Sequence, residues 1–328
     1  MTTRHLVDPE LLAAIEAMPS RDITAENLDQ VRALRAEMLA ALPPPTVTDI
    51  EVNERAIPGP AGAPDVRVLV YQPQNAAGGL AGFLHIHGGG YIIGSPEMTD
   101  ARNRLIARDL GCVVVSVDYR LAPETAFPGA VEDCYAALRW LHAEAGALGV
   151  DVGRIAIGGE SAGGGLTAGL ALLARDRGEV PVAFQLLIYP MLDDRTGTTV
   201  EASPMVAEFG WSRGSNRFGW ASLLGHDPGG ADTSPYAAAA RAEDLADLPP
   251  AYIAVGTLDL FLEENIEYAR RLMRAGVPTE LHVYPGAYHG FQGLAPEARI
   301  SKAFVRDYVE ALTVALSVRG GVEVGVTA

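Results

Sequence analysis

The side chain best suited to chemistry in this sequence is Ser161, in the segment Gly158-Gly159-Glu160-Ser161-Ala162-Gly163-Gly164-Gly165. A short apolar run, residues 154–157, precedes this segment, and an Ala/Leu-rich stretch, residues 166–174, follows it. This order predicts a strand, a tight turn and a helix. The inner five residues read G-x-S-x-G, a pattern that lifts the serine hydroxyl to the top of a sheet and points the start of a helix at it. Glycines suit the flanks of such a turn because neighbouring Cβ atoms would clash there.

A second glycine-rich segment, His87-Gly88-Gly89-Gly90, follows the apolar run of residues 80–86. Attack of a serine on a carbonyl forms an oxyanion, which needs backbone N–H donors fixed in advance, each worth on the order of 10²–10³ in rate. H-G-G-G loops supply such donors in lipases and esterases. We therefore expect the amides of Gly88, Gly89 and Ala162 to form an oxyanion hole. The alternatives are a simple connecting turn or a phosphate loop, but no G-x-G-x-x-G or G-K-[ST] pattern follows a strand here.

The general base is sought after Ser161, because this kind of site has the order serine, acid, histidine. Three histidines follow the serine. His289 lies in a Gly/Pro-rich loop after the predicted strand 280–284, where a catalytic histidine belongs. His282 lies inside that strand pattern and His226 in a polar segment, so neither is favoured.

The best candidate for the acid is Asp259, which follows the apolar run 251–255 and a short break. Glu263 and Glu264 are close by, but they are typical of the first turn of the next helix, where acids are favourable. In this arrangement His289 takes the proton of Ser161, and Asp259 fixes the imidazole tautomer and stabilises the imidazolium.

Together these stretches resemble the hormone-sensitive lipase-like esterases, the bacterial H-G-G-G group of α/β-hydrolases. The matching segments are His85-Ile86-His87-Gly88-Gly89-Gly90-Tyr91, Asp118-Tyr119-Arg120-Leu121-Ala122-Pro123-Glu124 with Phe127-Pro128, Gly159-Glu160-Ser161-Ala162-Gly163, Asp259, and His289-Gly290-Phe291. They run in the family's order from about residue 80 to 291. Two positions depart from the usual pattern: Glu160 stands where Asp is more common, and Leu260 stands where D-P-L has proline.

The resemblance implies an α/β-hydrolase fold with a small helical cap, and a serine carboxylesterase acting on small esters of short to medium acyl length. It implies Ser161, Asp259 and His289 as the catalytic groups and His87 as a brace for the glycine loop. A homodimer formed through an edge strand is also what the resemblance suggests. Neither a cofactor nor a metal is implied, because His85 and His87 have no further ligand cluster beside them.

Charge and composition limit the classes of partner that this chain is expected to bind. The 328 residues include 25 basic and 41 acidic side chains, a net charge of −16, which disfavours nucleic acid and anionic membranes. Cys112 and Cys134 lie in a strand and a helix pattern and are expected to be buried reduced thiols. The first residues lack an apolar signal core and no apolar run reaches transmembrane length, so we expect a cytoplasmic protein.

The pattern predicts a mostly parallel sheet between helices. Expected strands are 50–56, 66–71, 80–86, 112–118, 154–158, 184–189, 252–255 and 280–284, and expected helices are 99–110, 130–146, 162–177, 262–275 and 297–317. Residues 9–42 are read as helices with one apolar face formed by Leu28, Val31, Leu34, Met38, Leu39 and Leu42. The expected units are a helical cap segment (1–45), the core (46–192 and 226–318), a cap insertion (193–225) and a frayed tail (319–328).

The insertion holds Phe209, Trp211, Phe218 and Trp220. These aromatics could form a small satellite core, or a substrate-binding wall above Ser161, since ligand sites are mostly apolar. We take Phe209, Trp211 and Tyr91 as the wall candidates. Arg120 and Asp133 are interpreted as structural groups that hold the turn after residue 118.

Two other functions remain open. A non-catalytic small-ligand receptor could use the same fold, since fold does not fix function. Amide hydrolysis or acyl transfer to an alcohol would use the same groups. The complete set of Ser161, Asp259 and His289 argues against a receptor, which needs none of them.

Overall fold

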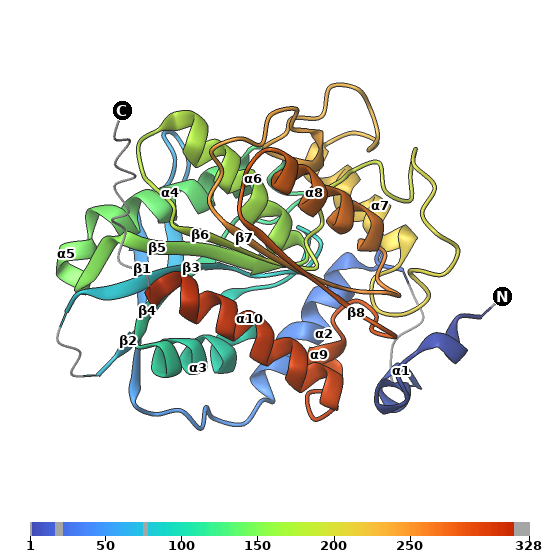
Figure 1. The fold of residues 1–328 in the computed structure, drawn as a ribbon, viewed down its shortest axis with the longest axis horizontal. Coiled ribbons are helices and arrows are strands. Elements are labelled where there is room, and N and C mark those ends of the chain that lie inside the picture. Colours follow the sequence, from blue (N-terminus) through green and yellow to red (C-terminus); the bar gives the residue numbers. More distant parts are fainter. Residues whose placement is uncertain (1, 17–21, 75–77, 318–328) are drawn as a thin grey trace, which may run out of the picture.

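An eight-stranded sheet forms the centre of the computed structural model, which describes residues 2–16, 22–74 and 78–317 (Figure 1). The strand order is β1-β2-β4-β3-β5-β6-β7-β8. Strand β2 pairs antiparallel with β1 and β4, and all other neighbours are parallel. The strands are β1 (Ile50–Ile57), β2 (Val66–Pro73), β3 (Leu80–Ile86), β4 (Cys112–Asp118), β5 (Val150–Glu160), β6 (Phe184–Ile188), β7 (Ala251–Gly256) and β8 (Thr279–Tyr284).

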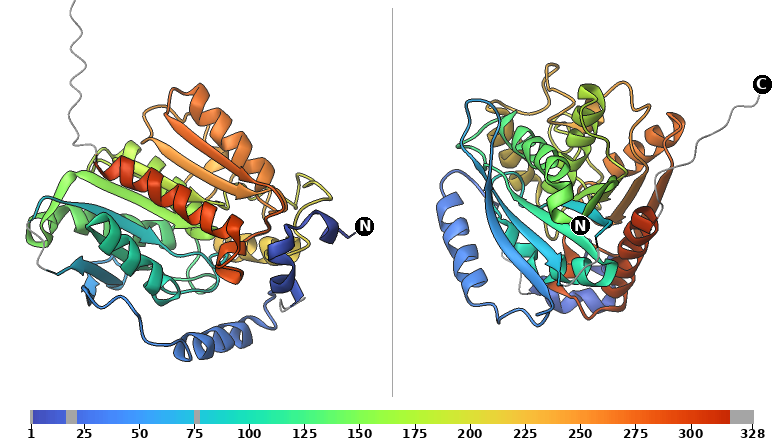
Figure 2. Two further views of the ribbon diagram at one scale, coloured as in Figure 1. Left: turned by 60° about the horizontal axis from the view of Figure 1, so that its bottom comes forward. Right: turned by 90° about the vertical axis from the view of Figure 1, so that its left-hand side faces the viewer.

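Helices cover both faces of the sheet, which is why the central strands are apolar throughout rather than alternating. On one face, α3 (Asp100–Leu110) and α10 (Arg299–Ser317) pack on the strands, and on the other lie α4 (Gly129–Ala143), α6 (Ala162–Arg177) and α8 (Leu262–Arg274) (Figures 1 and 2). Other helices are α1 (Leu12–Glu16), α5 (Ala145–Leu148), α7 (Arg213–Leu224) and α9 (Phe291–Leu294). The predicted fold class, a mostly parallel sheet flanked by helices, is confirmed.

The parallel strands bring the candidate residues to one edge of the sheet. Ser161 follows β5, Asp259 follows β7 and His289 follows β8, each in the turn after the carboxyl end of its strand. The glycine loop follows β3, the strand beside β5. Because parallel strands end on the same side, residues from distant parts of the sequence meet there.

Several element boundaries differ from the expected ones. Strand β5 begins at Val150 and runs to Glu160, longer than residues 154–158, because it pairs with β3 on one side and β6 on the other. The expected helix 130–146 is divided into α4 and α5, with Glu144 between them. The last helix begins at Arg299 rather than residue 297.

The N-terminal segment departs most from expectation. Helix α2 (Leu28–Ala40) forms, but its apolar stripe does not face the core: Leu28 is buried, whereas Leu34 and Met38 are more than half exposed. The helix is attached instead through Arg32, whose guanidinium donates to the Ile92 and Ala122 carbonyls at 2.9 Å. A polar clamp therefore replaces the packing that the apolar spacing predicts.

Three further expectations concern the termini, the thiols and the membrane. The expected tail, 319–328, and residues 17–21 of the first helical stretch lie outside the described residues. Cys112 and Cys134 are buried and free, as expected. Within the described ranges, none of the helices combines the length and the apolar character needed to cross a bilayer.

Candidate active site

The turn between β5 and α6 holds Ser161 in a strained conformation. Its φ of 56° and ψ of −120° lie outside the regions that side-chain-bearing residues favour. Its backbone is fixed on both sides, since its N–H donates to the Ile188 carbonyl at 2.9 Å and its carbonyl accepts from Met191 N–H at 3.0 Å. Helix α6 begins at the next residue, Ala162, so its positive end points toward the serine.

Ser161, His289 and Asp259 form one chain of hydrogen bonds. The Nε2 atom of His289 lies 2.9 Å from Ser161 Oγ, and its Nδ1 atom lies 2.7 Å from Asp259 Oδ2. Asp259 is fully buried, and its other oxygen accepts from Phe261 N–H at 2.9 Å. With a carboxylate at Nδ1, that nitrogen carries the proton, which leaves Nε2 as an acceptor facing the serine hydroxyl. The structure thus brings together the three residues selected by order along the sequence.

Aromatic rings hold the His289 imidazole from two sides. Phe261 meets it edge-to-face, with ring centroids 5.2 Å apart and an interplanar angle of 87°, and Tyr189 lies at 4.7 Å. Tyr189 is itself fixed, because Gln292 donates a hydrogen bond to its hydroxyl. Only 7% of Ser161 and 11% of the His289 side chain are exposed, so the hydrogen-bonded chain lies in a largely dry setting.

The glycine loop lies directly against this turn. A Cβ added to Gly88 would be 2.8 Å from the Glu160 carbonyl oxygen and 3.4 Å from Ser161 Cβ, so only glycine allows this approach. The Gly89 carbonyl accepts from the N–H groups of Ile92 and Ile93, which fixes the turn. Among the residues that the structure describes, the N–H groups of Gly88, Gly89 and Ala162 donate to no protein acceptor.

His87 braces the loop, as the resemblance implies. Its ring stacks on Tyr119 at 4.3 Å, and its Nδ1 donates to the Gly88 carbonyl at 2.8 Å. Burial lowers the pKa of His87 to about 4, which keeps the imidazole neutral. The Tyr119 hydroxyl donates to the His87 carbonyl at 3.0 Å, so the loop is held from the chain that leaves β4.

Arg120 and Asp133 hold that same chain, as expected. Asp133 is fully buried and accepts from the Arg120 backbone N–H at 3.0 Å and from its Nε at 2.8 Å. The pair joins the turn after β4 to helix α4, and therefore supports the glycine loop indirectly.

A buried charge lies beneath the serine turn. The Glu160 carboxylate is 12% exposed and contacts Arg102 on α3 at 2.5 Å and His85 on β3 at 3.2 Å. Burial by itself would raise the pKa of Glu160, but Arg102 and His85 outweigh it and lower the pKa to about 2. Ser116 on β4 lies 2.9 Å from the other ring nitrogen of His85, so α3, β3 and β4 converge under the serine turn.

A second buried acid, Glu264, clamps the chain after β6. It accepts from Leu192 N–H at 2.6 Å and from the Thr196 hydroxyl. Burial raises its pKa well above the usual value, opposed by these hydrogen bonds. Its neighbour Asn265 donates to the Pro190 carbonyl at 2.7 Å. Glu264 does begin a helix, as predicted, but it lies inside the protein and not on its surface.

The candidates for the substrate-binding wall differ in how deeply they are buried. The Trp211 ring lies 6.5 Å from that of His289 and contacts the glycine loop so closely that a Cβ on Gly90 would be 2.3 Å from it. Phe209 is partly buried, 6.2 Å from the Tyr288 ring. Tyr91 is almost fully buried, donating to the Met191 carbonyl at 3.0 Å and packing on Trp220 at 5.2 Å. Phe218 is partly buried against the core.

Contacts also join the N-terminal residues to the segment around α7. Asp22 accepts from the Ser212 hydroxyl at 2.6 Å, the Ile23 N–H donates to Ser215 Oγ at 2.9 Å, and Thr3 bonds Glu208. The division into core, cap segment and cap insertion stays a prediction. The two other histidines lie elsewhere: His226 is exposed, and His282 on β8 packs against Tyr252 on β7, with ring centroids 5.2 Å apart.

Reasoning from sequence missed the groups that surround the site. The ion pair between Arg102 and Glu160 joins α3 to the serine turn, and the spacing of residues along the chain does not predict it. The available signal was Glu160 itself, a charge inside an otherwise apolar and glycine-rich turn, because such a charge needs a partner when buried. Tyr189 and Phe261 flank the candidate strands and could have been noted as ring neighbours of His289.

Comparison with known proteins agrees with this geometry. A family model described as alpha/beta hydrolase fold matches residues 83–293. Esterase LipI of Mycobacterium tuberculosis is 37% identical over 302 residues, covering 88% of this chain and 89% of the relative. Carboxylesterase NlhH of the same organism is 35% identical over 295 residues, covering 88% and 90%. A solved bacterial heroin esterase superposes with a TM-score of 0.87 at 43% identity, covering 96% of this chain and 99% of that structure. The chain therefore belongs to the α/β-hydrolase fold family, within its hormone-sensitive lipase-like group.

Proposed function

We propose that this chain is a serine carboxylesterase that hydrolyses small esters of short to medium acyl length through an acyl-enzyme. The observation that carries the proposal is the hydrogen-bonded chain from Ser161 Oγ through His289 to Asp259, at 2.9 and 2.7 Å. The esterase names of relatives that match most of the chain support the substrate class.

In the proposed reaction, His289 accepts a proton and then donates it, first while the acyl-enzyme forms and again while it is hydrolysed. His289 Nε2 takes the Ser161 proton while Ser161 Oγ attacks the ester carbonyl carbon, and the buried Asp259 stabilises the imidazolium. The tetrahedral intermediate collapses, the C–O bond to the alcohol breaks, and the alcohol leaves with the proton from His289. Water then loses a proton to His289 and attacks the acyl-enzyme, releasing the acid and restoring Ser161.

The amides of Gly88, Gly89 and Ala162 would bind the oxyanion. Their lack of an acceptor within the described part of the chain supports this role, as does the position of Ala162 at the first turn of α6, where N–H groups have no intrahelical partner. Donors held by a rigid loop need no reorganisation when the charge forms. His87 would act only by holding the loop, since its neutral ring bonds Gly88.

Trp211 and Phe209 would face the acyl or alcohol group, and their bulk would limit its length. Tyr91 would support this wall from behind, given its burial and its contact with Trp220. The low exposure of Ser161 is consistent with a narrow entrance that favours small esters.

The test is hydrolysis of 4-nitrophenyl esters from acetyl to dodecanoyl by the wild type, Ser161→Ala, Asp259→Asn and the exposed control Ser317→Ala. We expect the highest kcat/KM with short acyl chains, and losses on the order of 10³ or more for Ser161→Ala and Asp259→Asn. Ser317, at the end of α10, bonds only the Thr313 carbonyl among the described residues, and we expect its variant to keep full activity.

Turnover that survives in Ser161→Ala at more than a few per cent would remove Ser161 from the proposed role. A folded wild type that turns over none of the esters would favour the receptor alternative. Burst kinetics with amides, or faster product formation with added alcohol, would instead identify amide hydrolysis or acyl transfer by the same groups.

A further inference from the structure

Residues 207–211 lie across the loops that hold the proposed catalytic groups, and we call this segment the strap. The Ala207 N–H donates to the carbonyl of Leu258, the residue before the proposed acid, at 3.2 Å. A Cβ on Gly210 would be 2.4 Å from the His289 carbonyl oxygen and 3.0 Å from its Cβ, so the backbone of the strap touches the loop of the proposed base. The strap therefore contacts the site through its backbone as well as its side chains.

The two aromatic side chains of the strap are the wall candidates. Phe209 packs on Tyr288, with ring centroids 6.2 Å apart, and Trp211 lies against Gly90 of the glycine loop. The position of the strap therefore sets how much space remains for an acyl or alcohol group. Ala207 has a φ of 70°, in the left-handed region that disfavours a side chain, so the strap needs contacts that hold it in place.

Glu208, in the middle of the strap, joins it to the N-terminal segment. Its carboxylate accepts from the Thr2 and Thr3 hydroxyls, each at 2.6 Å, and from the Thr3 N–H. Burial opposes the ionisation of Glu208, but the hydrogen bonds from Thr2 and Thr3 outweigh it and lower its pKa. Hydrogen bonds to a carboxylate are about twice as strong as those between neutral groups. Thr3 is only 2% exposed, so its contact with Glu208 is partly shielded from water.

The chain that follows the strap is held by a second contact from the N-terminal segment. Ser212, the next residue after the strap, donates its hydroxyl to Asp22 at 2.6 Å. A Cβ on Gly214 would be 2.0 Å from the same carboxylate, so Asp22 lies directly against the start of α7. The contacts at Glu208 and Ser212 therefore lie on either side of the aromatic wall.

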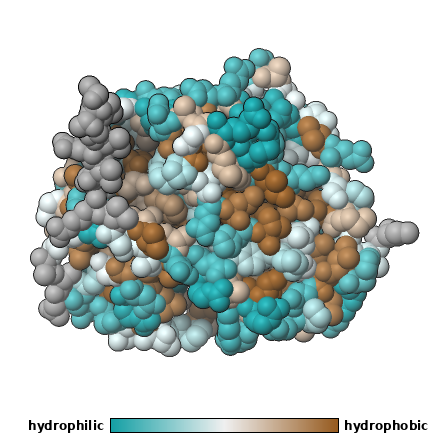
Figure 3. Space-filling view, viewed as in Figure 1, coloured by the Kyte–Doolittle hydropathy of each residue, from teal (hydrophilic) through white to brown (hydrophobic). Residues whose placement is uncertain are grey.

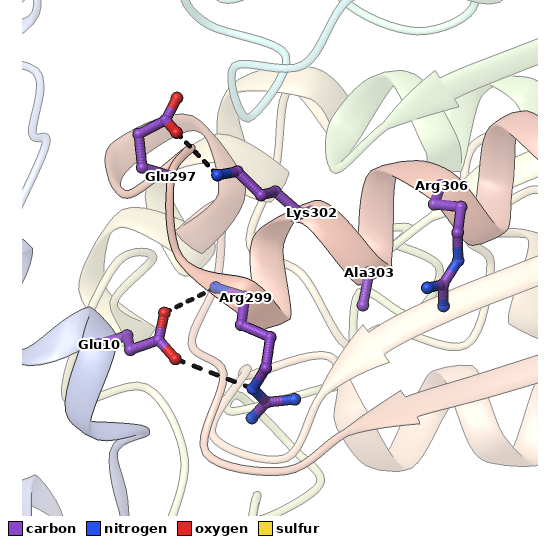
Figure 4. Close-up of a pocket in the computed structure, with 6 residues that line it drawn as sticks. All are labelled: Glu10, Glu297, Arg299, Lys302, Ala303 and Arg306. Atoms are coloured by element: carbon purple, nitrogen blue, oxygen red, sulfur yellow. Dashed lines mark hydrogen bonds and ion pairs between the residues drawn. The ribbon is translucent and has the colours of Figure 1, made fainter.

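The N-terminal segment is itself attached to the core. Leu11 is fully buried in an apolar cluster that includes side chains of α10. Hydrophobic and hydrophilic side chains lie side by side at this edge of the molecule (Figure 3), in keeping with attachment by both apolar and polar contacts. Figure 4 shows Glu10 reaching the start of α10, where it accepts from the Arg299 N–H at 2.7 Å. The Asp8 N–H donates at 3.1 Å to the carbonyl of Gly286, in the loop that carries the proposed base.

We propose that Glu208 is a positioning residue that sets the acyl-length preference of this site. Held by Thr2 and Thr3, it fixes the strap so that Phe209 and Trp211 close the site to long acyl groups. Release of Glu208 lets the strap move outward and enlarges the space. The acyl-length role rests on the proposed esterase function, whereas the anchoring of the strap can be measured without any substrate.

The first measurement is the ratio of kcat/KM for the octanoyl and acetyl 4-nitrophenyl esters. In Glu208→Ala we expect this ratio to rise about fivefold or more, while kcat for the acetyl ester changes by less than about twofold, because the catalytic groups keep their own hydrogen bonds. Thr3→Val keeps the shape of Thr3 but removes one donor, so it should raise the ratio as well. Thr3→Ser keeps both donors and should match the wild type.

Glu201→Ala is the matched control, because the Glu201 side chain is exposed and bonds nothing within the described part of the chain. The second measurement is hydrogen exchange, followed by mass spectrometry, of peptides that cover the strap. Exchange there should be about tenfold faster or more in Glu208→Ala, and unchanged in Glu201→Ala and in peptides of β3.

An unchanged ester ratio in an active Glu208→Ala variant, an equal loss of kcat/KM for all esters, or unchanged exchange of the strap would overturn the role of Glu208. A wild type that hydrolyses no ester would overturn the proposed function, and the acyl-length role with it. The comparison of Thr3→Val with Thr3→Ser differs by one side-chain donor, so it remains decisive even if Glu208→Ala fails to fold.

Discussion

The charge of Glu160 is expected to stabilise the fold substantially, although it lies inside a turn that must also hold a strained serine. The substitution Glu160→Gln keeps the side-chain length and one acceptor oxygen for Arg102, so it removes the charge and little else. Lowering a carboxyl pKa from 4.5 to about 2 corresponds to about 3 kcal/mol of folding free energy when the group is ionised. Since Gln retains part of the hydrogen bonding, we expect a loss of about 2–3 kcal/mol near neutral pH.

The pH dependence of that loss follows from the direction of the shift. The pKa of Glu160 is lower in the folded state, so its contribution is complete above about pH 4.5 and disappears as the pH falls toward 2. The assay is urea unfolding of both proteins at pH 7, 5, 4 and 3, followed by tryptophan fluorescence. The difference between wild type and Glu160→Gln should be constant from pH 7 to 5 and shrink below that.

An exposed ion pair provides the control. Glu267 pairs with Arg270 at 2.7 Å, but both side chains are about half exposed, so Glu267→Gln should lose no more than about 0.5 kcal/mol. If Glu160→Gln loses no more than this control, or if its deficit persists unchanged at pH 3, the electrostatic account of the turn is wrong.

Three further outcomes are expected. Trp211→Ala should move the optimum of the 4-nitrophenyl ester series toward longer acyl chains, and an unchanged profile would exclude Trp211 from the wall. Relative to the wild type, Glu264→Gln should gain stability as the pH rises above 4.5, by up to about 1.4 kcal/mol per pH unit, because the raised pKa of the buried carboxyl opposes the ionisation that the unfolded carboxyl undergoes; a pH-independent difference in urea unfolding would contradict this. Gly90→Ala should destabilise the protein by about 1–3 kcal/mol, through overlap with the Trp211 ring and through the strain of a side chain at φ +60°, and Trp211→Ala should relieve the overlap but not the backbone strain in the double variant, a partial non-additivity that thermal unfolding can measure.

Much of the fold was predictable because its signals are local. The glycines around Ser161 predict the tight serine turn, and strands β3 and β4 begin and end where their apolar runs do. The order of Ser161, Asp259 and His289 along the chain was enough to predict that they meet, because the turns that follow parallel strands lie at one edge of the sheet.

Other features depended on contacts that spacing does not encode. The apolar stripe of α2 predicts a core-facing helix, but Leu34 and Met38 remain exposed because Arg32 attaches the helix by hydrogen bonds to carbonyls. The spacing predicts Glu264 as a first-turn acid, which is correct for the helix but does not predict the chain after β6 that folds over it. The charge balance under Ser161 needed Arg102 from another element.

The contact between Gly90 and Trp211 has a consequence for how sequences of this kind can diverge. A side chain on Gly88 would meet the serine turn and one on Gly89 would meet the Ile93 carbonyl, whereas the third glycine faces the indole and leaves space for it. A larger residue at position 90 meets two obstacles, the indole and a backbone φ of +60° that favours glycine, and a smaller residue at position 211 removes only the first. Position 211 can therefore change alone, whereas a change at position 90 must follow it, and libraries that vary one position at a time would record position 90 as immutable and position 211 as variable.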